Sequence, residues 1–146
     1  MAIPRNIRLA PGQIVMLEFG PDPRQVAAPG IRTGPLGVLP EMYKLRHCIV
    51  VSTTTGLTTI VPLSTKAPLR PRPLHVPIPA GKYPGTSVTE DSWIKSDLLT
   101  TVSSDRVDRV LVAGRRTTVI LDAADLTAVR AAVLHALQLG RLTSGL

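Results

Sequence analysis

The chain has 146 residues, 44% of them hydrophobic, and a formal net charge of +7. This length and composition are typical of one globular domain, which we expect to span residues 1–146. No apolar run reaches the ~18–20 residues of a membrane-spanning helix, and the N-terminus lacks the apolar core of a secretory signal. The single cysteine, Cys48, excludes an internal disulfide and a cysteine-based zinc site. These observations predict a cytoplasmic protein without a membrane partner.

The positive charge is concentrated in the middle of the chain. No Asp or Glu occurs between Met42 and Thr89. The basic residues of this segment are Lys44, Arg46, Lys66, Arg70, Arg72 and Lys82. Because a field of one sign attracts polyanions, the segment is a candidate surface for nucleic acid. The alternative is an ordinary solvated basic surface.

The first predicted element is a strand over Gln13 to Phe19, an apolar and β-prone run. It is followed by Gly20 to Leu45, which is rich in Pro and Gly and shows no sustained periodicity. We expect residues 20–45 to form a long flexible loop, and loops of this length are usually functional or disordered.

A hairpin is predicted next. The runs Arg46 to Thr53 and Leu57 to Ser64 are apolar and β-prone, and a turn containing Gly56 separates them. Pro62 predicts an unpaired segment or a bulge near the end of the second run. Shorter strands are predicted within Arg72 to Ile78, Ser92 to Leu99 and Arg109 to Leu121.

The last predicted element is a helix. Asp122 stands where an N-cap belongs, Asp125 lies near the positive end of the helix dipole, and Gly140 is placed to end the helix. An apolar stripe at helical spacing consists of Leu126, Val129, Val133 and Leu137. We expect this stripe to pack against the sheet.

Several of these segments carry a resemblance to a known family. They are PGQIVMLEF, KLRHCIVVS, TTIVPLST, LHVPI, SWIKSDLLTTVSSDRV and DLTAVRAAVLHALQLGRL. In this order they resemble the MazF/PemK toxins of type II toxin–antitoxin systems, over most of residues 11–142. The second segment is similar to the family's Lys-x-Arg-Pro before an apolar strand.

The resemblance implies a mainly β fold: a compact, twisted antiparallel sheet of SH3-like barrel character, of the CcdB/PemK type, with a C-terminal helix. It also implies a homodimer, an RNA groove across the dimer interface and an antitoxin partner. The implied activity is that of an endoribonuclease that cleaves single-stranded RNA without a metal ion.

Such cleavage needs a base for the 2′-hydroxyl, an acid for the leaving 5′-oxygen and a fixed cation for the phosphate. The sequence contains no HExxH, no carboxylate triplet and no P-loop. We therefore expect neither a metal nor a cofactor.

Arg46 is the first catalytic candidate, because it matches the family's Arg that contacts the scissile phosphate. The alternative is a surface Arg paired with a carboxylate. His47 occupies the position where the family usually has Pro, and it is either a base or a neighbour pointing to the other face of the strand. Thr65 matches the family's Ser/Thr that can donate to a phosphate oxygen, and Ser64 replaces it if the register slips by one.

Lys95 and Asp97 are two residues apart and would share a face in an extended segment. They resemble the Arg-x-Asp pair of some family members, which can act as acid and base. The alternative for this pair is a plain surface ion pair. For His75, which lies among apolar residues, the alternative to a functional role is a structural one. The expected RNA-binding residues are Lys44, His47, Ser64, Lys66, Arg70, Arg72 and His75.

Two rival functions remain open at this point. The first is a catalytically degraded nucleic-acid-binding module of the same fold, favoured by His47 in place of Pro and Lys95 in place of Arg. The second is a gyrase poison like CcdB, which shares the fold but acts by binding a protein.

Overall fold

The structure is a computed structural model that describes residues 8–20 and 44–146. The strands in these ranges are β1 (Gln13–Glu18), β2 (Leu45–Thr54), β3 (Leu57–Ser64), β4 (His75–Ile78), β5 (Ser92–Lys95), β6 (Thr100–Ser103), β7 (Val107–Val112), β8 (Arg115–Thr117) and β9 (Val119–Ile120). The helix is α1 (Ala123–Ala136), and the short 3-10 helices are η1 (Ser96–Leu98), η2 (Ser104–Arg106) and η3 (Gly140–Gly145).

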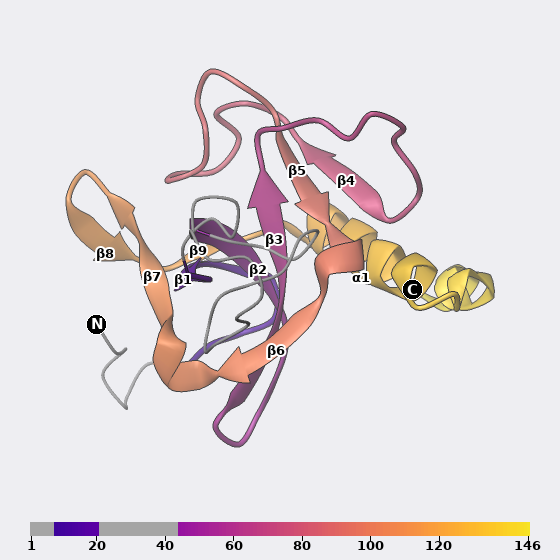
Figure 1. Ribbon diagram of the computed structural model, residues 1–146, viewed down its shortest axis with the longest axis horizontal. Helices are drawn as coiled ribbons and strands as arrows, with labels where there is room; N and C mark the ends of the chain where they lie inside the picture. The colour runs from indigo at the N-terminus through magenta and orange to yellow at the C-terminus, as the bar shows by residue number, and fades with distance from the viewer. Residues whose placement is uncertain (1–7, 21–43) are drawn as a thin grey trace, which may run out of the picture.

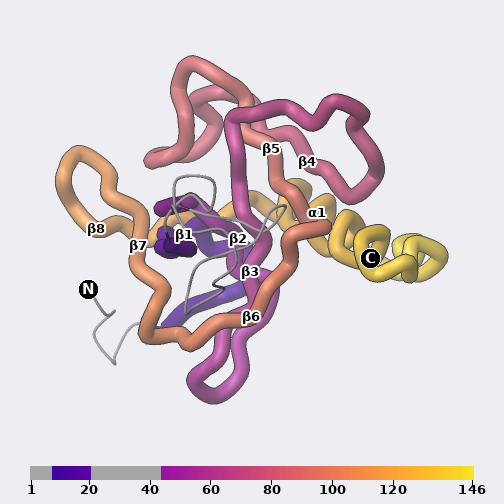
Figure 2. Tube along the Cα trace, viewed as in Figure 1, coloured from indigo at the N-terminus to yellow at the C-terminus, as the bar shows by residue number. Residues whose placement is uncertain are grey.

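The strands form one antiparallel sheet that curls back on itself. Its main order is β4-β5-β3-β2-β1-β7-β8, while β6 pairs with β3 and β9 with β1. Since β6 leads through η2 directly into β7, one bent segment joins the β3 side of the sheet to the β1 side (Figures 1 and 2). The predicted class, a mainly β antiparallel sheet with a C-terminal helix, is confirmed.

The central strands are buried on both faces, which explains their continuous apolar runs. One face of β1–β3, which includes Ile14, Ile49 and Val61, packs with Val129 and Val133 of α1. The opposite face contributes to a second core, enclosed by β6 and β7. Its members are Val15, Leu17, Cys48, Val50, Ile60, Val102 and Val107. Adjacent residues of one strand thus belong to different cores.

The β2–β3 hairpin forms as predicted, with one irregularity on each strand. The register shifts by one residue between Val50 and Ser52, so the bulge lies in β2. On the outer side of β3, the pairing with β6 ends at Ile60 and the pairing with β5 begins at Leu63. Pro62 lies in this gap, which confirms the predicted unpaired segment and suits a residue without an N–H.

The predicted loop at 20–45 is shorter at its C-terminal end than expected. Leu45 is the first residue of β2, and the preceding residues already pair: Phe19 N donates to Lys44 O at 3.0 Å and Lys44 N to Gly20 O at 2.6 Å. The predicted flexibility concerns residues 21–43, which lie outside the described residues.

The three segments in which shorter strands were predicted all contain strands, each shorter than its segment. The segment Ser92 to Leu99 is not one strand, because β5 ends at Lys95, η1 follows and β6 begins at Thr100. Arg72 to Ile78 is a strand only from His75 onwards. Arg109 to Leu121 comprises parts of β7, β8 and β9, and the first turn is made by Ala113 and Gly114, both with positive φ.

The helix α1 begins as predicted and ends earlier. The Asp122 side chain caps it by accepting a hydrogen bond from Asp125 N at 2.8 Å. The residue in the left-handed conformation past its end is Gln138, with φ of 62°, so the expected role of Gly140 was wrong. The buried residues are Val129, Ala132 and Val133, whereas Leu137, at 53% exposed, lies outside the apolar stripe. In the described ranges no helix is long and apolar enough to cross a membrane.

Candidate active site

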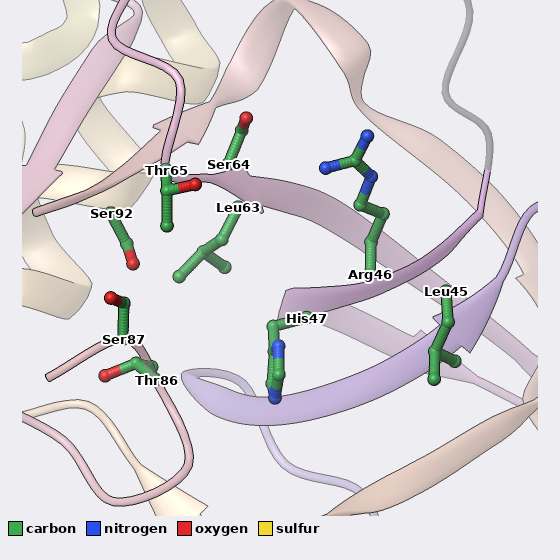
Figure 3. Close-up of a pocket in the computed structure, with 9 residues that line it drawn as sticks. All are labelled: Leu45, Arg46, His47, Leu63, Ser64, Thr65, Thr86, Ser87 and Ser92. Carbon is green, nitrogen blue, oxygen red and sulfur yellow. The ribbon is translucent and has the colours of Figure 1, made fainter. Parts of the chain in front are cut away.

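Four strands bring polar side chains to one face of the sheet. Cys48 lies opposite Pro62, Ser64 opposite Trp93, and His75 opposite Lys95. Because side chains alternate along a strand, these pairings place Arg46, Ser64, Lys95 and His75 on the same face. We call this face, together with Lys66 just beyond β3, the cationic face. Figure 3 shows Arg46 and Ser64 pointing to the same side of their strands.

The cations of this face lie close enough to affect one another. Burial is the main cause that lowers the pKa of Lys95, and the charges of Lys66 and Arg46 lower it further. The Asp97 carboxylate acts in the opposite direction. A lysine with a lowered pKa is a better proton donor at neutral pH than an ordinary lysine.

His75 and Asp97 are held beside Lys95. Arg72 N donates a hydrogen bond to His75 Nδ1 at 3.1 Å, which leaves Nε2 to face Asp97 Oδ2 at 3.9 Å. The His75 side chain is only 7% exposed, whereas the Asp97 side chain is 40% exposed. A buried imidazole with both nitrogens directed at protein groups is suited to orienting Asp97, and Asp97 remains open to a ligand.

Asp97 reaches this place by a route that the sequence pattern did not predict. The expectation that Lys95 and Asp97 share the face of one extended strand was wrong, because Asp97 lies in η1. The two residues are nevertheless neighbours, since Asp97 influences the titration of Lys95. The pair therefore arises from the end of β5 and the turn of 3-10 helix that follows it.

A pocket of about 260 Å³ opens at the ends of β2 and β3. Its lining residues are Leu45, Arg46, His47, Leu63, Ser64, Thr65, Thr86, Ser87 and Ser92. Arg46 and Ser64 reach it from the cationic face, whereas His47 and Leu63 project to the other side of the strands (Figure 3). His47 therefore faces away from Arg46, and Ser64 rather than Thr65 shares the face of Arg46.

Thr86, Ser87 and Ser92 were missed by the sequence analysis. They belong to the loop between β4 and β5 and to the first residue of β5. Short hydroxyl side chains in a loop carry no distinctive sequence signal, and only the folded loop brings them opposite His47. The described part of the pocket wall contains no carboxylate.

The loop that carries these hydroxyls is anchored on three sides. Gly81 N donates to Ser87 O at 2.9 Å, and Ala80 N donates to Asp91 Oδ1 at 2.9 Å. Gly85, with φ of 82°, lies so close to Val110 that a Cβ atom would overlap its side chain. The pocket wall is therefore fixed against the sheet.

The remaining predicted residues lie apart from the pocket. Lys44, Arg70 and Arg72 do not line it, and Arg72 contributes through its backbone contact with His75. The charge of Lys82 is also compensated within the protein, because its Nζ pairs with Asp125 at 2.7 Å and Asp122 at 3.1 Å. The segment that is acid-free in sequence is thus partly neutralised in space. In residues 8–20 and 44–146, no three His, Cys, Asp or Glu side chains form a group that could hold a metal ion.

Comparison with known proteins identifies the family. The model of the PemK-like, MazF-like toxins of type II toxin–antitoxin systems matches residues 10–137. The chain therefore belongs to this toxin family. No curated protein sequence gives a match.

Solved structures share the fold at low sequence identity. One is MazF from Deinococcus radiodurans, with a TM-score of 0.59, 20% identity, and coverage of 91% of this chain and 99% of that chain. Another is a mycobacterial endoribonuclease in complex with its cognate antitoxin, with a TM-score of 0.58, 15% identity, and coverage of 90% of this chain and 97% of that chain. The Mycobacterium tuberculosis toxin MazF-mt6 has a TM-score of 0.51 and 18% identity, and the match covers 68% of this chain and 92% of that chain.

Proposed function

We propose that this protein is an endoribonuclease toxin that cuts single-stranded RNA in the cytoplasm without a metal ion and leaves a 2′,3′-cyclic phosphate. The observation that carries the proposal is the gathering of Arg46, Lys66 and Asp97 around Lys95 at the ends of β2, β3 and β5. Membership of the PemK-like, MazF-like family supports it.

The reaction is a transfer of the phosphate ester within the RNA. Asp97 accepts the proton of the 2′-hydroxyl, whose oxygen attacks the adjacent phosphorus. The bond from phosphorus to the 5′-oxygen breaks, and Lys95 donates the proton that this oxygen takes. Arg46 and the Ser64 hydroxyl stabilise the negative charge on the non-bridging oxygens.

We also propose that the protein acts as a homodimer and is neutralised by a cognate antitoxin. The support is the family match together with the mycobacterial endoribonuclease, which was solved with its antitoxin. The family match also weighs against a gyrase poison, since it identifies the PemK-like branch of this fold.

Replacement of the phosphate-binding cation tests the proposal. Arg46→Ala should reduce the rate of RNA cleavage by at least ~10²-fold, because a fixed cation at the developing charge is lost. Arg130→Ala, which removes an exposed arginine from α1, is the matched control and should leave the rate unchanged. Equal rates for both variants would contradict the assigned role of Arg46. A wild-type protein that binds RNA but cuts none would favour the binding-module alternative.

A further inference from the structure

We propose that the pocket between His47 and the β4–β5 loop holds one nucleobase beside the cleaved phosphate and selects the cleavage sequence at that position. We call it the base pocket, formed by His47, Leu63, Thr86, Ser87 and Ser92. The proposal rests on the proposed ribonuclease function and names the part of the substrate that this wall of the site would recognise.

The position of the base pocket favours a nucleotide. Its wall continues into Arg46 and Ser64, which lie on the cationic face where the phosphate is expected to bind. A nucleotide at the ends of β2 and β3 would place its phosphate on one side of the strands and its base on the other (Figure 3). The volume of about 260 Å³ lies just below the range of ~300–1,000 Å³ typical of drug-sized ligands, so it suits one base ring system.

The base pocket contains hydrogen-bonding groups that the described part of the chain leaves unused. Ser92 is 5% exposed, its hydroxyl has no hydrogen-bond partner within the described ranges, and it points into the pocket (Figure 3). A hydroxyl that is directed into a pocket and makes no hydrogen bond within the protein can both donate to and accept from a ligand. The imidazole of His47 likewise has no partner among those residues, and burial lowers its pKa. It is therefore neutral at pH 7, with one donor and one acceptor nitrogen.

Two neighbouring hydroxyls present opposite hydrogen-bonding character. Thr86 Oγ1 donates to Tyr83 O at 2.8 Å, so its remaining capacity is to accept. Ser87 Oγ accepts from Glu90 N at 3.1 Å and from Thr89 N at 3.4 Å, so its remaining capacity is to donate, either to Thr89 Oγ1 at 3.5 Å or to a ligand. An acceptor beside a donor, fixed in a rigid loop, is the arrangement that can read the edge of a base.

Phe or Leu side chains from a protein partner would gain little from such a wall, because they would leave its polar groups unpaired. A base satisfies these groups while its ring covers Leu63. The geometry thus favours RNA over an apolar peptide as the occupant.

The test compares cleavage-site profiles on a pool of RNA with randomised sequence. Ser87→Ala and Ser92→Ala should lower the base preference at one position next to the cut by about 3–10-fold, the scale of one hydrogen bond, and leave the other positions unchanged. Ser87→Thr retains the hydroxyl and should retain the preference. Ser52→Ala, an exposed serine near the far end of the hairpin, is the matched control.

A second readout separates this proposal from the proposed function. Short oligonucleotides with 2′-deoxy sugars across the target sequence lack the attacking hydroxyl and cannot be cut. Competition among such oligonucleotides measures base preference by binding alone. Loss of one preferred base in the serine variants supports the base pocket, even if the wild type fails to cleave. Unchanged preference in both readouts, including the Ser87→Ala/Ser92→Ala double variant, would overturn it. Weakened antitoxin binding with unchanged RNA preference would overturn it as well.

Discussion

Burial and charge tune the individual residues of the site. The pKa of Lys95 falls because the side chain is partly buried and because Lys66 and Arg46 repel its charge. Lysine lacks the bidentate geometry of arginine, but it can lose a proton much more readily. The combination favours Lys95 as a proton donor rather than as a rigid phosphate clamp.

The burial of His47 predicts a dependence of stability on pH. Its pKa in the folded state lies below the ordinary value of 6.5, because burial penalises the charged form. Its contribution to stability is complete above about pH 6.5 and is lost as the pH falls through the folded pKa. Urea unfolding should therefore show that the wild type loses more stability between pH 7 and pH 5 than His47→Gln does. Parallel curves for the two proteins would show that burial does not disfavour protonation of His47.

Among the residues that line the pocket, the sequence analysis named Arg46, His47, Ser64 and Thr65 and missed Thr86, Ser87 and Ser92. Arg46 and Thr65 were named from the family order of the strands, with Ser64 as the alternative to Thr65, because strand residues keep their order and alternation. Ser87 and Ser92 were not, because their approach to His47 depends on how residues 79–91 fold against Val110.

At the scale of elements, α1 is tied to the loop before β5 by a polar cluster. Tyr83 Oη donates to Asp125 Oδ2 at 2.6 Å and accepts from Asp122 N at 2.9 Å. Burial and the bond to Asp125 raise the pKa of Tyr83 to about 12, which keeps the hydroxyl protonated. One phenol thus joins the first turn of the helix to the loop that forms the base pocket.

Removal of this hydroxyl should weaken the fold. Tyr83→Phe is expected to lower the free energy of unfolding by about 1–3 kcal/mol, because two partly buried hydrogen bonds are lost. Urea denaturation provides the measurement. Thr101→Val removes an exposed hydroxyl that bonds to Thr59 and should change stability by less than about 0.5 kcal/mol. A Tyr83→Phe effect as small as that of the control would mean that the cluster does not stabilise the helix.

Element types were predicted better than element ends. Apolar runs with turn residues between them defined β1, β2, β3 and α1. The break after Lys95 was not visible, because it arises where β5 and β6 separate along β3 beside Pro62, a long-range pairing that local patterns do not encode.

At the scale of the whole molecule, the position of the cations matters more than the net charge. The basic middle segment was evident from the sequence. The capture of Lys82 by Asp122 and Asp125 was not, because those carboxylates are about 40 residues away in the chain. Lys66, Arg70 and Arg72 are exposed in or near the link between β3 and β4.

Replacing Lys66, Arg70 and Arg72 together by Gln should flatten the salt dependence of RNA binding, since fewer counterions are released. The measurement is the slope of log K against log salt concentration. A control that replaces Arg115, Arg130 and Arg141 by Gln removes the same charge from exposed positions elsewhere. If both triple variants show the same slope, the effect belongs to net charge and not to this surface.

Analysis of the reaction products identifies the group that attacks the phosphorus. Purified protein is incubated with long single-stranded RNA in excess EDTA, and the new ends are identified by mass spectrometry. We expect cleavage with a 2′,3′-cyclic phosphate on the upstream fragment, and no cleavage where the sugar at the cut site is 2′-deoxy. Cleavage that requires a metal ion, or that proceeds at a 2′-deoxy sugar, would contradict the proposed attack by the 2′-hydroxyl.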